Sequence, residues 1–156
     1  MLTIDIPGFK VLRIEHVVLD FNGTLAVDGR MLWGVKGRLV RLARSLKLHI
    51  VTGDTFGTAS AAVAGVPCTL VALPRTRQDR AKLAYVRKLG PARTLCIGNG
   101  RNDRLMLKAA AIGIAVLQEE GAASGALAAA DLMMPDIAAA LDALRSPLRL
   151  VASLRS

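Results

Sequence analysis

Short runs of apolar residues alternate along the chain with segments whose apolar residues recur at helical spacing. The apolar runs, each of three to six residues, predict strands at 16–20, 48–52, 68–72, 94–97, 112–117 and 132–134. Spacing near 3.6 residues predicts helices at 35–46, 55–64, 77–89, 102–110, 136–144 and from 147 onward. This alternation predicts an α/β fold, a Rossmann-like three-layer sandwich with a parallel central sheet and helices on both faces. The first fifteen residues fit either an edge strand or a segment that pads the core.

Length and composition indicate one globular domain over residues 1–156. Hydrophobic residues make up 53% of the chain and charged residues 21%, which excludes disorder. The most apolar tract, residues 121–144, is interrupted by acidic residues and a proline, so we expect no membrane-spanning helix. Cys68 and Cys96 lie in apolar runs and are expected to be buried, reduced thiols. No signal peptide is evident, and a cytoplasmic protein is expected.

The net charge of +9 is unevenly distributed. Residues 72–108 hold ten basic and two acidic residues, and such a segment attracts anions. Solvated helix faces, a small anionic substrate and nucleic acid all remain open as explanations. Nucleic acid is the least favoured of the three, because no helix-turn-helix, zinc-finger or aromatic RNA-stacking signature accompanies the charge.

Polar clusters lie where predicted strands end. Ligands of open parallel sheets bind outside the carboxyl ends of the strands, so these clusters are candidates for one site. Each cluster alone is weak evidence, whereas four of them in order are specific. They are Asp20–Thr24, Thr52–Thr55, Lys82 at the helix before the fourth strand, and Gly98–Asp103.

The residue types in these clusters suit phosphoryl transfer. The carboxylate of Asp20 can act as a nucleophile. A divalent metal bridging Asp20, a backbone carbonyl near Asn22, and Asp103 would neutralise a phosphate. Thr52 offers a hydroxyl and Lys82 a positive charge for the phosphoryl oxygens.

At these residues the sequence resembles the haloacid dehalogenase (HAD) superfamily, and within it the soluble group that is similar to P-type ATPases. Asp20-Phe21-Asn22-Gly23-Thr24 is similar to the D-x-D-x-T motif, and Thr52-Gly53-Asp54 to the T-G-D of P-type ATPases. Lys82 matches the motif lysine, and Gly98-Asn99-Gly100-Arg101-Asn102-Asp103 resembles G-D-G-x-N-D. The resemblance extends from about residue 17 to residue 116.

The resemblance implies a Mg²⁺-dependent phosphohydrolase that forms an aspartyl phosphate at Asp20 and acts on a small phosphorylated substrate. It implies catalytic roles for Asp20, Asn22, Thr52 and Lys82. It implies phosphate binding by Gly23, Thr24, Thr52, Gly53, Lys82 and Asn102. It implies metal binding by Asp20, Asn22, Asn99 and Asp103.

Two amides replace carboxylates of the family pattern. Asn22 stands where HAD phosphatases have the Asp that protonates the leaving group and activates water, and general acid–base help is worth about 10²–10⁴-fold. Asn99 stands where the family has a metal-binding Asp. We therefore expect slow turnover and weak Mg²⁺ binding. The same replacements favour an alternative, a non-catalytic or regulatory HAD module that binds phosphate or a partner protein.

The chain has no room for the cap domain that many HAD enzymes carry. The segment at about 24–34 fits only a short flap hairpin, and residues 55–79 fit one helix, one strand and a connection. Met31, Leu32 and Trp33 of the hairpin could either support a homo-oligomer or pack on the sheet. Asp54 could cap a helix or line the site, and Arg101 and Arg104 could flank a substrate phosphate or lie on a solvated helix surface.

The histidines are expected to be structural. His49 lies inside an apolar run and His16 begins one, so both are expected to pack in the core, with Tyr85 packing on a helix face.

Overall fold

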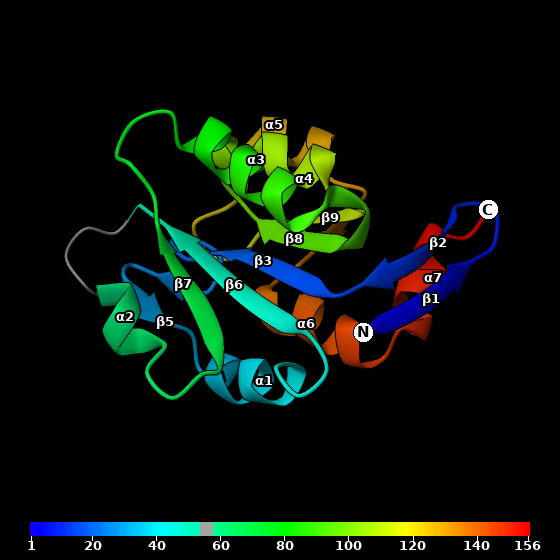
Figure 1. The fold of residues 1–156 in the computed structure, drawn as a ribbon, viewed down its shortest axis with the longest axis horizontal. Helices are drawn as coiled ribbons and strands as arrows, with labels where there is room; N and C mark the ends of the chain where they lie inside the picture. Colours follow the sequence, from blue (N-terminus) through cyan, green and yellow to red (C-terminus); the bar gives the residue numbers. More distant parts are fainter. Residues whose placement is uncertain (54–57) are drawn as a thin grey trace.

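A six-stranded parallel sheet forms the centre of the computed structural model, which describes residues 1–53 and 58–156 (Figure 1). Its strand order is β10-β9-β8-β3-β6-β7. The strands are β3 (His16–Asp20), β6 (Lys47–Thr52), β7 (Cys68–Ala72), β8 (Thr94–Gly98), β9 (Ile112–Val116) and β10 (Leu132–Met134). Each coincides with a predicted apolar run, so the predicted parallel sheet is confirmed.

Helices cover both faces of this sheet and complete the predicted three layers (Figure 1). One face carries α1 (Val35–Leu42) and α6 (Ile137–Arg145). The other face carries α3 (Gln78–Leu89), α4 (Arg104–Ala109) and α5 (Ser124–Ala129). The remaining helical segments are α2 (Thr58–Ala62), α7 (Leu148–Leu154) and two 3₁₀ turns, Pro91–Arg93 and Arg101–Asp103. Helix α5 was not predicted, because its small residues give little periodic contrast.

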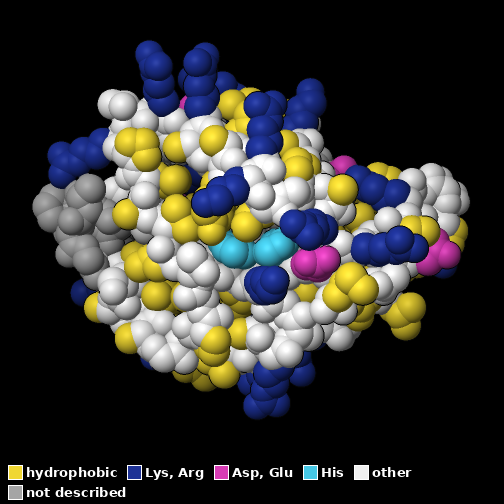
Figure 2. All heavy atoms as spheres, viewed as in Figure 1, with side chains coloured by type: hydrophobic (Ala, Val, Ile, Leu, Met, Phe, Trp, Pro, Cys, Tyr) yellow, Lys and Arg dark blue, Asp and Glu magenta, His cyan; other side chains and the backbone are white. Residues whose placement is uncertain are grey.

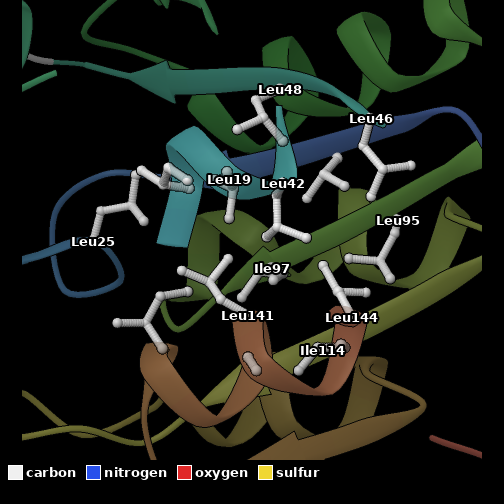
Figure 3. Close-up of a cluster of buried hydrophobic side chains, with 14 of the residues drawn as sticks. Leu19, Leu25, Leu42, Leu46, Leu48, Leu95, Ile97, Ile114, Leu141 and Leu144 are labelled. Atoms are coloured by element: carbon white, nitrogen blue, oxygen red, sulfur yellow. The ribbon is translucent and has the colours of Figure 1, made fainter. Parts of the chain in front are cut away.

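Leucine, isoleucine and valine make up most of the core, in keeping with the few aromatic residues. All five residues of β3 are buried, with Val17 and Leu19 in the cluster toward α1 and α6, and Val18 in the cluster on the opposite face. Figure 3 shows Leu141 and Leu144 of α6 pointing toward the strand side chains. Burying one such side chain contributes about 1.5–3 kcal/mol, so packing on both faces holds β3 in the middle of the sheet.

The strand β7 lies at the sheet edge and is only partly buried, unlike the strands inside the sheet. Cys68, its first residue, is half-buried, whereas Cys96 in β8 is fully buried. The expectation of two buried thiols is therefore wrong for Cys68, because its strand has a neighbour on one side only. Both cysteines are free, as predicted.

The first fifteen residues form a hairpin of their own instead of an edge strand. Strands β1 (Leu2–Ile6) and β2 (Lys10–Ile14) pair antiparallel in a separate two-stranded sheet. Buried side chains from both strands join the main core, and α7 contacts β1. The hairpin thus pads one end of the molecule, at the right of Figure 1.

A second, smaller hairpin follows β3 directly. Strands β4 (Ala26–Val27) and β5 (Arg30–Met31) pair antiparallel. Met31 and Leu32 pack partly on the core, whereas residue Trp33 is 96% exposed. In residues 1–53 and 58–156 no domain is inserted beside this hairpin or before α3. No described helix is long and apolar enough to cross a membrane.

The two histidines pack at the sheet, as expected, but they are also joined by hydrogen bonds. His16 Nδ1 lies 3.0 Å from His49 Nε2, and His49 Nδ1 lies 2.8 Å from the Tyr85 hydroxyl. Both histidine side chains are visible at the centre of the face in Figure 2, close to basic and acidic side chains. Each histidine residue is only 7% exposed.

Candidate active site

A cleft of about 420 Å³ opens at the carboxyl ends of the central strands. Its walls come from the segments that follow β3, β6, β8 and β9, together with the start of α3. The lining residues are Asp20, Asn22, Gly29, Gly53, Thr58, Gln78, Asn99, Gly100, Asn102 and Glu120.

Asp20, the last residue of β3, presents its carboxylate to this cleft. The side chain is 9% exposed, so one edge of it remains reachable from solvent. Lys82 Nζ donates to Asp20 Oδ1 over 2.6 Å, and the Thr24 hydroxyl lies 3.3 Å from Oδ2. The carboxylate is therefore held in one orientation by a cation and a hydroxyl.

Lys82 lies beneath the cleft and bridges two carboxylates. Its side chain is 1% exposed, and Nζ also donates to Asp103 Oδ1 over 2.6 Å. Asp103 is fully buried, and its Oδ2 accepts from the backbone N–H groups of Asn99 (3.0 Å) and Gly100 (2.8 Å). Asp103 thus fixes both the lysine and the loop after β8.

One lysine between two buried carboxylates leaves a net negative charge in this group. Burial, and next the nearby Asp103 carboxylate, raise the pKa of Asp20 to about 7, against the opposing effects of Lys82 and Thr24. Burial alone would lower the pKa of Lys82, but the charges and hydrogen bonds of the two carboxylates outweigh it and raise that pKa. A further positive charge at this site would therefore stabilise ionised Asp20.

The loop after β3 passes close to Asn99. Gly23 has φ +77°, and a Cβ there would meet the Asn99 side-chain amide nitrogen at about 2.4 Å, so glycine is required. Asn99 Oδ1 lies 3.3 Å from the Thr24 hydroxyl, and Asn99 Nδ2 donates to the Gly121 carbonyl over 3.0 Å. Asn99 is thereby held between the loops after β3 and β9.

The structure brings the predicted site residues to one place, in two layers. The cleft wall contains Asp20, Asn22, Gly53, Asn99 and Asn102. Buried close to it are Gly23, Thr24, Thr52, Lys82 and Asp103. Thr52 ends β6 and is 2% exposed, directly before Gly53 of the wall. Asp54, also predicted as a cap or site residue, lies outside the described residues.

Sequence reasoning missed the loop after β9. Gln118 Nε2 donates to the carbonyls of Gly23 (2.8 Å) and Thr24 (2.7 Å), and its Oε1 accepts from the Ile137 N–H over 3.1 Å. Glu120 lines the cleft and accepts from the Asp28 backbone N–H over 2.9 Å. These polar residues follow a strand of the parallel sheet, so the strand-end rule could have found them.

Gln78, the first residue of α3, was also missed. It lines the cleft, and its Oε1 accepts from Asn102 Nδ2 over 2.9 Å. Gly53 makes room for it, since a Cβ at 53 would overlap the Gln78 amide. The sequence carried no signal for this contact, because it depends on how α3 packs beside β6.

The donor set of the cleft is suited to a hard divalent cation. Asp20 and Asn99 in the cleft wall, with the Asp103 carboxylate buried behind them, offer oxygen ligands, which Mg²⁺ prefers. The described residues contain no metal-binding group of three or more His, Cys, Asp or Glu side chains. The residues therefore fit Mg²⁺ in ligand type, with fewer negative charges than a site built from carboxylates alone.

The fold is that of the HAD superfamily, as comparison with solved structures shows. A Streptomyces avermitilis protein described as a HAD-family hydrolase has 21% identity and a TM-score of 0.68, covering 84% of each chain. A Moraxella catarrhalis 3-deoxy-D-manno-octulosonate 8-phosphate phosphatase, solved with magnesium, phosphate and KDO, has 17% identity and a TM-score of 0.65. The match covers 91% of this chain and 87% of that one.

The resemblance to P-type ATPases has a structural counterpart as well. A zinc-transporting PIB-type ATPase in its E2.Pi state has 28% identity and a TM-score of 0.63, over 79% of this chain and 20% of that one. This chain is thus similar to one part of a much longer protein.

Two Methanocaldococcus jannaschii proteins resemble the chain in sequence. Uncharacterized protein MJ0073 is 46% identical over 61 residues, which cover 39% of this chain and 66% of that protein. Uncharacterized protein MJ0072 is 44% identical over 39 residues, which cover 25% of this chain and 89% of that protein. The chain belongs to the same family as MJ0072. No known family profile matches it.

Proposed function

We propose that this protein is a phosphohydrolase that forms an aspartyl phosphate at Asp20. The observation that carries the proposal is the Asp20 carboxylate, which reaches a polar cleft at the carboxyl end of β3 while Lys82 and Thr24 hold its oxygens. Such an orientation by a buried cation and a hydroxyl is what a carboxylate nucleophile needs. HAD phosphatases among the proteins of the same fold support the same reaction class.

Mg²⁺ is the cofactor that we propose for this site. Asp20, Asp103, Asn99 and the backbone carbonyl of Asn22 would hold it. The magnesium-containing phosphatase of the same fold supports this assignment. When bound, the ion would supply positive charge against the phosphate and the two carboxylates.

The reaction starts with attack of an Asp20 carboxylate oxygen on phosphorus. As the new P–O bond forms, the bond from phosphorus to the leaving oxygen breaks, and the leaving group departs with its electron pair. Lys82, together with the Thr52 hydroxyl, stabilises negative charge on the phosphoryl group. Water then attacks the aspartyl phosphate, which releases phosphate and restores the Asp20 carboxylate.

Asn22 limits this chemistry. Its side chain is exposed at the cleft, where an acid would protonate the leaving group and later activate water, but an amide does neither. The enzyme therefore favours substrates whose leaving group needs no protonation, such as acyl or aryl phosphates. Hydrolysis of the aspartyl phosphate is slow for the same reason.

A non-catalytic HAD module is the second candidate function. The observation that favours it is the pair of amides, Asn22 and Asn99, in the cleft wall, where they could bind phosphate without turning it over.

Hydrolysis of p-nitrophenyl phosphate with and without Mg²⁺ tests the proposal. We expect activity in the native protein, none in Asp20→Asn, and a rise in kcat of about 10²-fold in Asn22→Asp, since the added carboxylate supplies acid–base help. Chelation of the metal with EDTA is expected to remove the activity of both active proteins.

Asn102→Asp is the matched control, because it places the same new carboxylate elsewhere in the same cleft. It should not raise kcat. Inactivity of both the native protein and Asn22→Asp, combined with binding of inorganic phosphate, would instead establish the non-catalytic module.

A further inference from the structure

A second cleft, of about 400 Å³, opens beside the candidate active site. Gln78 and Asn102 line both clefts, and a 2.9 Å hydrogen bond joins their side chains. These two hydrogen-bonded amides therefore form the boundary that the two clefts share. The residues that line the second cleft are Arg77, Gln78, Asp79, Arg101, Asn102 and Arg104.

This second cleft is strongly basic. Among the described residues that line it, the one acid is Asp79, and Arg104 Nη2 lies 3.2 Å from Asp79 Oδ2. Arg77 and Arg101 are exposed, and in the described part of the chain neither forms an ion pair. Two guanidinium groups thus line this cleft without an ion-pair partner among residues 1–53 and 58–156.

Arg77 holds an unusual backbone conformation at this cleft. It precedes α3 in the left-handed region, with φ 55° and ψ 37°. A residue with a Cβ pays roughly 1–2 kcal/mol for this conformation, and glycine would avoid that cost. This conformation places an arginine, with its long cationic side chain, where glycine would cost less.

From this arrangement, and on the basis of the proposed phosphohydrolase function, we propose that the substrate carries a second anionic group, a carboxylate or a second phosphate, which Arg77 and Arg101 bind. The scissile phosphoryl group would lie at Asp20 in the first cleft, and the body of the substrate would pass Gln78 and Asn102. Guanidinium groups bind carboxylates and phosphates in bidentate fashion, which suits them to this role.

A small molecule fits these observations better than a nucleic acid. The arginines line a shallow cleft that adjoins the one lined by Asp20, and a chain of phosphates would need an extended basic track. The basic segment of the sequence is thereby assigned in part to substrate binding.

Competition by two phosphonates of similar size tests the inference. Propylphosphonate and 3-phosphonopropionate share the phosphonate and differ in a terminal methyl or carboxylate. Both compounds are tested as inhibitors of p-nitrophenyl phosphate hydrolysis. We expect 3-phosphonopropionate to bind about tenfold more tightly than propylphosphonate, which corresponds to about 1.4 kcal/mol. In the double variant Arg77→Ala/Arg101→Ala this preference should fall to about one.

Arg87→Ala is the control, since Arg87 is an exposed arginine in the last turn of α3 and lies outside both clefts. It should retain the preference. Equal inhibition of the native protein by both phosphonates would overturn the second-anion inference while leaving the phosphohydrolase in place. RNA binding is measured in parallel at low and high salt. If the double variant loses salt-sensitive RNA binding but keeps the phosphonate preference, the second-anion inference is overturned as well.

Failure of the proposed function would look different. If p-nitrophenyl phosphate is not hydrolysed at all, calorimetric titration of the same two phosphonates gives their affinity ratio without catalysis. A ratio of about ten that depends on the two arginines would support the subsite, and a ratio of one would refute it.

Discussion

The buried trio of Asp20, Lys82 and Asp103 dominates the site at the scale of single residues. Two carboxylates each lie 2.6 Å from one ammonium group, and all three side chains are at most 9% exposed. Removing one partner from a buried ion pair leaves an uncompensated charge in the interior. The stability lost in this way is larger than the net stability that the intact pair contributes. The trio thus couples Asp20 to the stability of the fold.

Lys82→Met is expected to lower the free energy of unfolding by about 3–5 kcal/mol, because two buried carboxylates then face each other without a cation. Urea unfolding, monitored by circular dichroism, measures this free energy. Lys88→Met, an exposed lysine on the same helix, should change stability by less than about 0.5 kcal/mol. Adding Asp20→Asn to Lys82→Met should recover part of the loss. Equal stability of the two lysine variants would contradict this account of the trio.

The histidine pair predicts a pH dependence of stability. Burial, with the nearby His16 and Lys47, lowers the pKa of His49 from 6.5 to about 4. The unfolded chain therefore protonates His49 near pH 6.5 and the folded chain only near pH 4. Its contribution, about 2–3 kcal/mol, is complete above pH 6.5 and is lost as the pH falls to 4.

His49→Gln removes this titration while keeping a polar side chain beside Tyr85. We expect the free energy of unfolding of the variant, measured by urea unfolding from pH 7 to pH 4.5, to fall less steeply than that of the native protein. Parallel curves would show that His49 does not titrate in this way.

The loop after β9 joins the parts of the site at the scale of elements. Gln118 bonds two carbonyls of the loop after β3 and the first N–H of α6. Through these bonds one side chain sets the position of the loop that carries Asn22 relative to the sheet.

Gln118→Glu keeps the acceptor for Ile137 but removes the donor to the Gly23 and Thr24 carbonyls. We expect a loss of about 1–3 kcal/mol of stability and a lower kcat, because two carbonyls lose their partner and face a carboxylate. Urea unfolding measures the stability, and the kinetics of p-nitrophenyl phosphate hydrolysis give kcat. Glu119→Gln, at the exposed neighbouring position, should alter neither. An unchanged Gln118→Glu enzyme would show that the loop needs no such link.

Periodicity predicted the central strands and most helices, because buried parallel strands such as β3 and β8 are apolar throughout. The N-terminal hairpin could not be placed, since the one-sided burial of β2 fits an edge strand of the main sheet equally well. Motif spacing placed Asp20, Asn99 and Asp103 at one sheet edge. Two contacts could not be predicted: the bridge from Lys82 to two carboxylates, and the approach of Gln78 to Gly53. Both depend on helix packing that local sequence does not encode.

At the scale of the whole molecule, the basic side chains and the second cleft lie in the same region. Basic side chains project from the edge of the molecule that α3 and its neighbours form (Figure 2), and the second, arginine-lined cleft involves the start of α3. No inserted domain covers the cleft in the described residues, and only the short β4–β5 hairpin with exposed Trp33 lies beside it. A ligand bound in either cleft would therefore contact the residues that line it.

The central claim is that Asp20 becomes phosphorylated, and phosphoenzyme trapping tests it most directly. Native protein is incubated with Mg²⁺ and radiolabelled acetyl phosphate, quenched in acid, and digested for mass analysis. Because Asn22 cannot activate water, we predict that label accumulates on the peptide containing Asp20, is released by hydroxylamine, and is absent in Asp20→Asn. Label that persists in Asp20→Asn, or native protein that hydrolyses acetyl phosphate without any acid-stable label on Asp20, would contradict the mechanism.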